Sequence, residues 1–207
     1  MSRPKRLTRS EQQEATRQHL LDAAEALFAQ RGIAATPIED IAEAAGFSRG
    51  AFYSNFADKH ALVMVLLRRK AEQSNIELAD MMEHSSSATN FLETVRKREL
   101  DMTRNALLME FHQYALHNLD AKPELAAINQ ASRRMTEQLV TEIWKEIQGP
   151  VPVTAELASK VLQSLDDGIT TLRLIEPDEF PAGMYTDVVI LLHEALVALA
   201  EKRNASS

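Results

Sequence analysis

A cluster of cationic and hydroxyl side chains near residue 50 has the chemistry needed to bind phosphate groups. Residues 48–56 read SRGAFYSNF, and no acidic residue occurs between Glu43 and Asp58. Phosphates are bound by Lys and Arg cations, by hydroxyl and amide donors, and by backbone N–H groups at helix N-termini. The side chains of these kinds here are Ser48, Arg49, Tyr53, Ser54, Asn55 and Lys59. We therefore expect this segment to face a polyanion.

The residues around this cluster predict two short helices joined by a tight turn. Apolar residues recur at helical spacing over 38–45, and Gly46 can adopt positive φ at little cost. TPIE at 36–39 has capping-box spacing with proline at the first helical position, and Ser48 is expected to cap the second helix. The arrangement is that of a helix-turn-helix, whose second helix enters the DNA major groove. The alternative is a capped helical hairpin that forms part of an all-α core.

The rest of the chain also has helical periodicity, and no strand-like alternation persists for six residues. We expect an all-α fold of about nine helices. The expected helices cover 10–30, 36–46, 48–57, 58–82, 91–118 (one bent helix, or two divided near 104–105), 125–147, 157–174 and 184–202. Asp58 is expected to cap the fourth helix, and Thr154 to start the one near 157.

Composition and charge exclude several classes of protein. The 207 residues include no cysteine, which excludes disulfides and thiolate metal sites. The net charge of −7 lies entirely in 61–207, because 1–60 hold eight basic and eight acidic residues, and 1–20 carry +3. The N-terminal part therefore remains suited to a polyanion. The longest apolar run, 61–67, is far shorter than the roughly 20 residues of a membrane span. We expect no membrane helix, no secretory signal and a cytoplasmic location.

Motifs for catalysis are missing from the sequence. None of the six histidines follows a glutamate by three residues, so the Glu-x-x-His bundle signature of di-iron sites is absent. His193-Glu194 is not followed by a histidine at 197, and no glycine-rich phosphate loop occurs. We expect no enzymatic activity, no cofactor and no metal.

Residues 20–62 resemble the N-terminal domain of the TetR (tetracycline-repressor-like) family. The shared landmarks are AA…LF…G in the first helix, Thr36, IA..AG at 41–46, S.G..Y..F at 48–56 and K..L at 59–62. They span about a quarter of the chain, and LDDG at 165–168 is one further, short match. The resemblance implies a transcription regulator, usually dimeric and usually a repressor that a small ligand releases from DNA. It suggests a DNA-binding domain at 1–57, with a basic flexible arm at 1–9, and an effector-binding and dimerisation domain at 58–207.

The resemblance also implies roles for single residues. Thr36 and Pro37 would start the helix that crosses the DNA backbone; Ser48, Arg49, Gly50, Ala51 and Phe52 would face the groove; Tyr53 and Lys59 would contact phosphates. Arg49 is the expected base reader, because arginine pairs with two acceptors of guanine. Many relatives have a histidine-rich YHHF where this chain has YSNF, so Asn55 would either read an adenine or bond a phosphate. The arm would reach phosphates or a minor groove, or act as a disordered solubilising tail.

Two apolar stripes near the C-terminus are broader than a surface helix needs. The first holds Leu157, Val161, Leu165, Ile169 and Leu172 with Gly168, and the second holds Met184, Val188, Leu191, Leu192, Ala195 and Leu199. We expect the two helices to pair with a symmetry mate as a four-helix homodimer interface. The alternative is that both stripes are core of one chain.

An unknown small-molecule effector is expected to bind among the helices between 85 and 175. The candidates are polar side chains within apolar windows and nearby Met and aromatic residues: Phe91, Arg98, Met102, Met109, His112, Tyr114, Met135, Trp144 and Asp166, with Arg104, Phe111 and His117 in the same set. The sequence therefore favours a ligand-responsive regulator that binds a double-stranded, palindromic operator as a dimer. The alternative is an all-α interaction or scaffold protein without effector-regulated DNA binding.

Overall fold

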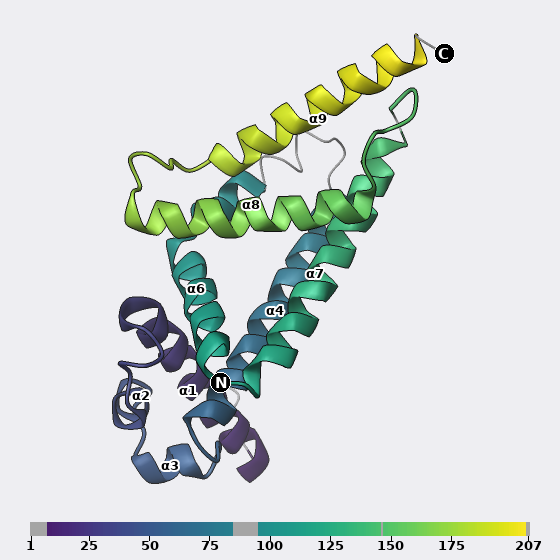
Figure 1. The fold of residues 1–207 in the computed structure, drawn as a ribbon. Coiled ribbons are helices and arrows are strands. Elements are labelled where there is room, and N and C mark those ends of the chain that lie inside the picture. Colours follow the sequence, from purple (N-terminus) through teal and green to yellow (C-terminus); the bar gives the residue numbers. More distant parts are fainter. Residues whose placement is uncertain (1–7, 85–94, 146, 206–207) are drawn as a thin grey trace, which may run out of the picture. The chain divides into compact units, whose positions relative to one another are not determined.

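The computed structural model describes residues 8–84, 95–145 and 147–205, and every regular element among them is a helix. These are α1 (Arg9–Arg31), α2 (Ile38–Ala44), α3 (Arg49–Tyr53), α4 (Lys59–His84), α6 (Met102–His117), α7 (Ala121–Trp144), α8 (Ala155–Ile175) and α9 (Met184–Asn204) (Figure 1). A further helical segment covers 95–99. The expected all-α fold of about nine helices is confirmed.

The chain forms two compact units. The first comprises Met1–Ala71 and Ala106–Lys122, and the second comprises Glu72–Asn105 and Pro123–Ser207. The start of α4 belongs to the first unit, where Leu62, Val63 and Leu66 are fully buried. These units therefore differ from the functional division expected at 57/58, which stays a prediction.

Capping residues determine where the helices of the first unit begin and end. α1 begins with a capping box in which Thr8 and Glu11 bond each other's backbone N–H, and it ends at Gly32 with φ 85°. Ser48 caps α3 by accepting a hydrogen bond from a backbone N–H. Asp58 does the same for α4, at 2.7 Å. The caps predicted at Ser48 and Asp58 are confirmed.

The capping box predicted at 36–39 is wrong. α2 begins at Ile38 with Pro37 at the N-cap position and no side-chain cap. Thr36 is fully buried, and its hydroxyl donates to the carbonyl of Gly32 at 2.7 Å. The hydroxyl therefore closes the turn after α1 and is not available to the first turn of α2.

Two of the predicted boundaries after residue 100 shift, and a third is confirmed. α7 starts at Ala121 because Pro123 lies in its first turn, where the missing N–H costs nothing, so the break expected at 119–124 is wrong. The divide expected near 104–105 lies at 100–101, just before α6. α8 begins where expected, since Thr154 caps it by accepting from the N–H of Leu157.

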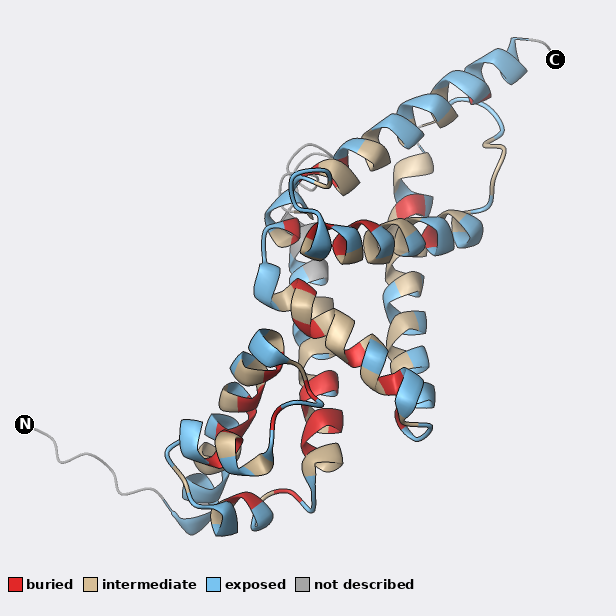
Figure 2. Ribbon diagram, turned by 60° about the vertical axis from the view of Figure 1, so that its left-hand side comes forward, coloured by how far each residue is buried: buried red, intermediate tan, exposed pale blue. Residues whose placement is uncertain are grey.

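The core of the first unit is formed by apolar side chains that α1 to α4 and α6 contribute. Figure 2 shows buried residues along one face of α1 and at the start of α4. The largest side chains at 0–2% exposure are Leu20, Leu21, Phe28, Ile33, Ile41, Phe52, Leu62, Val63, Leu66, Leu107 and Phe111. This packing fixes the two short helices, which have too few residues to be stable alone. Among the described residues, no helix is long and apolar enough to cross a membrane.

Candidate nucleic-acid interface and apolar cavity

A tight turn holds α2 and α3 as a helix-turn-helix. Gly46 has φ 78°, which strains any L side chain, and the N–H of Phe47 donates to the carbonyl of Ala42 at 2.8 Å. The rings of Phe52 and Phe56 are buried, with centroids 5.6 Å apart. Because both rings are buried, they hold α3 against the rest of the first unit and leave its first turn facing outward.

The outward face of α3 is polar and basic. Ser48, Arg49, Gly50, Tyr53 and Ser54 are exposed. At Gly50 an added Cβ would meet only the Ser48 hydroxyl, at 3.6 Å. The protein itself therefore does not require a glycine there.

Arg49 forms a salt bridge on this face. Its guanidinium lies 2.9 Å from the Glu39 carboxylate of α2, and 3.4 Å from the Tyr53 hydroxyl. The hydrogen bond with Tyr53, and then the charge of Glu39, raise the pKa of Arg49. Because both partners of the salt bridge are more than half exposed, the pair is weak and can be exchanged for a phosphate or a base.

Four residues expected at the interface direct their side chains inward. Thr36 and Phe52 are fully buried, so their side chains do not reach a DNA groove. The Asn55 amide donates to the carbonyl of Ala51 at 2.8 Å, and its Oδ1 is buried. The Lys59 ammonium donates to the carbonyls of Ile33 (2.8 Å) and Thr36 (2.9 Å), and burial lowers its pKa. All four therefore position the motif from inside the unit.

Three positioning residues escaped the sequence analysis. Arg17 of α1 donates to the carbonyl of Asn55 at 2.8 Å, and its guanidinium lies 4.3 Å from the centre of the Phe56 ring. Glu110 of α6 accepts a hydrogen bond from the N–H of Ile33 at 2.7 Å. The His60 ring and the Tyr114 hydroxyl, expected to belong to an effector pocket, are hydrogen-bonded at 2.9 Å. α6 thus holds both the α1–α2 loop and the start of α4.

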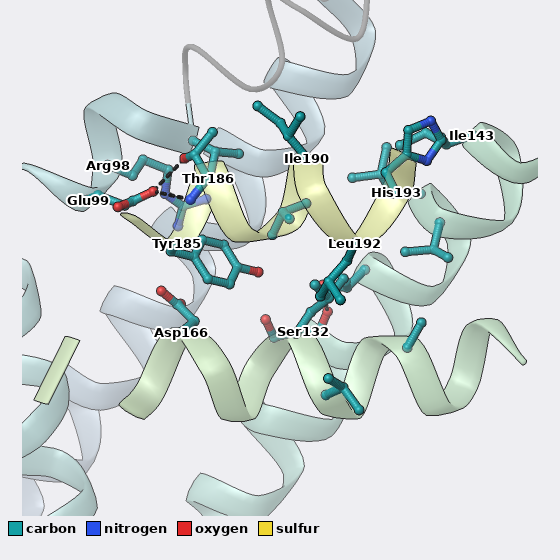
Figure 3. A pocket seen from close by; sticks show the side chains of 18 of the residues that line it. Arg98, Glu99, Ser132, Ile143, Asp166, Tyr185, Thr186, Ile190, Leu192 and His193 are labelled. Atoms are coloured by element: carbon teal, nitrogen blue, oxygen red, sulfur yellow. Dashed lines mark hydrogen bonds between the residues drawn. The ribbon is translucent and has the colours of Figure 1, made fainter. Parts of the chain in front are cut away.

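The second unit contains a cavity of about 510 Å³ (Figure 3). The apolar residues that line it are Val95, Leu139, Val140, Ile143, Trp144, Val153, Leu157, Ala158, Val161, Leu162, Val189, Ile190, Leu192 and Leu196. Its volume lies within the range of small-molecule sites. α7, α8 and α9 contribute most of this lining.

One end of the cavity is polar. Arg98, Arg104, Asp166 and Tyr185 line it, and Figure 3 shows Asp166 beside the Tyr185 ring. Burial raises the pKa values of Asp166 and Tyr185. Burial, and then the charge of Arg104, lower the pKa of Arg98.

Of the expected pocket residues, the cavity brings together Arg98, Trp144 and Asp166, with Arg104. Met102, Met109, His112, Tyr114 and Met135 do not line it, nor do Phe111 and His117, and Phe91 lies outside the described residues. Of these, Met109, Phe111, His112, Tyr114 and His117 belong to the first unit. The contribution of α9, including Tyr185, was missed, because its apolar residues fit a dimer stripe equally well.

The two apolar stripes on α8 and α9 are largely exposed. Leu157, Val161, Gly168, Leu172, Leu191, Leu192, Ala195 and Leu199 are exposed; Leu165, Met184 and Val188 are half-buried; Ile169 is buried. Leu157, Val161 and Leu192 also line the cavity. At Gly168 an added Cβ would meet nothing within 4 Å. An exposed apolar area of this kind is typical of an interaction surface.

Within the described ranges, no group of three or more His, Cys, Asp or Glu side chains is placed to hold a metal ion.

Comparison with known proteins identifies the family. Residues 20–65 match the family described as "Bacterial regulatory proteins, tetR family". The HTH-type transcriptional regulator AcrR of Shigella flexneri is 29% identical over 217 residues, or 98% of each chain. The HTH-type transcriptional regulator TtgR of Pseudomonas putida is 30% identical over 188 residues, 84% of this chain and 86% of that protein.

A solved structure agrees with the sequence comparisons. It is that of NalD, the secondary repressor of the MexAB-OprM multidrug efflux pump in Pseudomonas aeruginosa. It has a TM-score of 0.62 and 27% identity, and the match covers 87% of this chain and 94% of that one. The exposed basic face of a helix-turn-helix thus occurs on the fold of known regulators, and this chain belongs to the tetR family of DNA-binding transcriptional regulators.

Proposed function

We propose that this protein is a dimeric repressor that binds a palindromic operator and leaves it when a small molecule binds. The observation that carries the proposal is α3, whose first and last residues, Arg49 and Tyr53, are exposed while Phe52 and Phe56 are buried beneath it. Arg49 would read guanine, and Ser48, Tyr53 and the backbone at Gly50 would contact the duplex. The similarity to NalD, a repressor of an efflux pump, supports repression and makes genes of an efflux pump the first targets to test.

Dimerisation would come from the exposed stripes of α8 and α9. Two such helices from each of two chains make a four-helix interface. A two-fold dimer would present its α3 helices about 34–36 Å apart, which matches successive major grooves on one side of DNA. The basic arm at 1–9 would add phosphate contacts.

The cavity in the second unit would hold the effector. α4 and α6 are continuous helices that contribute residues to both compact units. A ligand that favours one setting of these helices would change the spacing of the two α3 helices, and so would lower operator affinity. We place the protein in the cytoplasm, where its operator lies, and assign it no catalytic activity.

A salt-dependent gel shift on the DNA upstream of the protein's own gene tests this function. We expect specific binding that weakens steeply with salt, because phosphate contacts release counterions. Arg49→Ala should lower specific affinity by about 10- to 100-fold, while helicity and dimerisation persist. Glu39→Gln is the matched variant with the opposite expected effect. It should raise operator affinity, because it frees Arg49 from its salt bridge and removes a negative charge near the duplex.

Two outcomes would count against the proposal. Full specificity in Arg49→Ala would show that Arg49 is not the base reader. A dimeric sample with no sequence preference at any salt would favour the alternative, an interaction or scaffold protein without effector-regulated DNA binding.

A further inference from the structure

One acidic group that lines the cavity, Glu99, is already neutralised. Glu99 lies 3.0 Å from the guanidinium of Arg173, and both side chains are 4% exposed. It also accepts hydrogen bonds from the N–H groups of Gly183 (2.8 Å) and Thr186 (2.9 Å) and from the Thr186 hydroxyl. A carboxylate that makes these bonds has no capacity left for a ligand, so Glu99 is structural.

The charged groups left at this end are Arg98, Arg104 and Asp166, with a net charge of +1. In the described part of the chain, neither guanidinium lies within 4.0 Å of the Asp166 carboxylate. The acid near Arg98 is Glu77, at 3.9 Å and 58% exposed, where water screens its charge. Arg98 also donates to the Ser74 hydroxyl, and Arg104 makes one long bond of 3.4 Å to Asn105. Among the described residues, both arginines retain N–H groups that donate no hydrogen bond.

Arg98 and Arg104 are partly buried, and partly buried cations gain from an acceptor that replaces the water they have lost. An anion that enters this end brings the local charge to zero, whereas a cation brings it to +2. Arg guanidinium groups suit carboxylates and phosphates, which accept two parallel hydrogen bonds. The neutral Tyr185 hydroxyl adds a further donor.

The remainder of the cavity is mostly apolar, with Ser132, Thr136, His193 and Glu194 among its polar lining residues, and it sets the size of the ligand body. Trp144, Val189 and Ile190 lie along it with the other apolar lining residues. A volume of about 510 Å³ holds roughly 17 groups at about 30 Å³ for each water-sized group. We propose that the effector is an amphipathic organic monoanion, with a carboxylate or similar head at Arg98 and Arg104 and an apolar body of roughly 15 non-hydrogen atoms. This inference rests on the proposed effector role of the cavity.

The test compares three probes with the same chain and different heads: dodecanoate, dodecan-1-ol and dodecylamine, each below its critical micelle concentration or, for dodecan-1-ol, below its solubility limit. Trp144 is the single tryptophan and lines the cavity, so its fluorescence in the full-length protein reports binding. We expect dodecanoate to bind about 10-fold or more tightly than either other probe, because its hydrogen bonds are charge-assisted.

Variants locate the head group. Arg98→Gln and Arg104→Gln should each weaken dodecanoate binding by about 10-fold and leave dodecan-1-ol unchanged. Arg96→Gln is the matched control, because Arg96 is half exposed, pairs with Asp187 and does not line the cavity. Asp166→Asn should retain or tighten dodecanoate binding. Circular dichroism shows which variants are folded. One folded arginine variant is enough to test the position of the head group.

A preference for dodecylamine that Asp166→Asn abolishes would overturn the proposal and make the cavity a cation site. Equal binding of all three probes would also overturn it. Gel shifts with dodecanoate separate this inference from the function. If dodecanoate binds but does not release the operator, the ligand class stands and the effector role is refuted. If only a compound of a different class releases the operator, the effector role stands and the ligand class is refuted.

Discussion

The two units use their charged side chains in different ways. Around the helix-turn-helix, the charged side chains of Lys59, Arg17 and Glu110 form hydrogen bonds with backbone groups of the same unit. At the polar end of the cavity, Arg98 and Arg104 retain unused donors, and Asp166 has no close partner among the described residues. The helix-turn-helix is therefore held in place by bonds within the first unit, while the second unit would gain stability from the anion that we propose binds there. Four predictions sharpen or break this contrast.

The largest effect is expected where the second unit presents apolar surface to another chain. Leu191→Glu would bury a charge in the proposed interface, so we expect a monomer by light scattering and a loss of operator affinity of about 100-fold or more. Leu116→Glu is the control, because Leu116 of α6 is similarly exposed and lies outside both stripes. A stable Leu191→Glu dimer would rule out the stripes as the interface.

Gly50→Ala tests whether the outward face of α3 is shaped for close approach. Since the added methyl meets only an ordinary contact, the variant should be more stable by up to about 1 kcal/mol. Operator affinity should nevertheless fall about 10-fold if the duplex reaches the backbone there. Thermal unfolding and gel shifts measure the two effects. Unchanged affinity would mean that DNA does not approach Gly50.

Lys59→Met separates an internal role from a phosphate contact. The variant leaves the carbonyls of Ile33 and Thr36 without their charged donor, so the free energy of unfolding should fall by about 1–3 kcal/mol. The salt dependence of operator binding should not change. If Lys59 instead contacted a phosphate, the logarithmic slope would decrease by about 0.9.

The smallest effect concerns Asp166 and depends on pH. Its folded-state pKa is raised above the reference value of 3.8, so the folded protein holds this proton more tightly than the unfolded chain. Its contribution to stability is therefore lost as pH rises from about 3.8 through the folded-state pKa. Asp166→Asn should melt roughly 2–4 °C higher at pH 7 and show no gain near pH 3, if ionisation costs about 1 kcal/mol. The exposed Asp178→Asn should show neither change.

Local signals in the sequence predicted much of the fold. Ser48 and Asp58 cap helices as expected, and Gly32 and Gly46 adopt the positive φ that their turns need. Each of these signals depends on neighbours within a few residues. Helix positions, the turn and the outward basic face could therefore be derived before the structure.

Contacts between distant residues escaped prediction. The spacing of residues 36–39 predicted a side-chain cap for α2, but the Thr36 hydroxyl instead donates a hydrogen bond to the carbonyl of Gly32. The cavity joins Arg98 with Asp166 and Tyr185, nearly 90 positions apart, and no local pattern encodes such a meeting. Met109 and His112 fitted the expected composition of a pocket equally well, yet they lie in the other unit.

The hydrogen bonds that join α6 to the α1–α2 loop and to the start of α4 have a consequence for synthesis of the protein. Residues 1–71 emerge from the ribosome first, but Glu110 and Tyr114, which bond Ile33 and His60, follow much later. At about 5–20 residues per second, the 51 residues between 71 and 122 take roughly 3–10 s to translate. During that interval the nascent DNA-binding unit lacks Leu107 and Phe111 of its core. The DNA-binding unit can therefore be completed only after more than half of the chain has been translated.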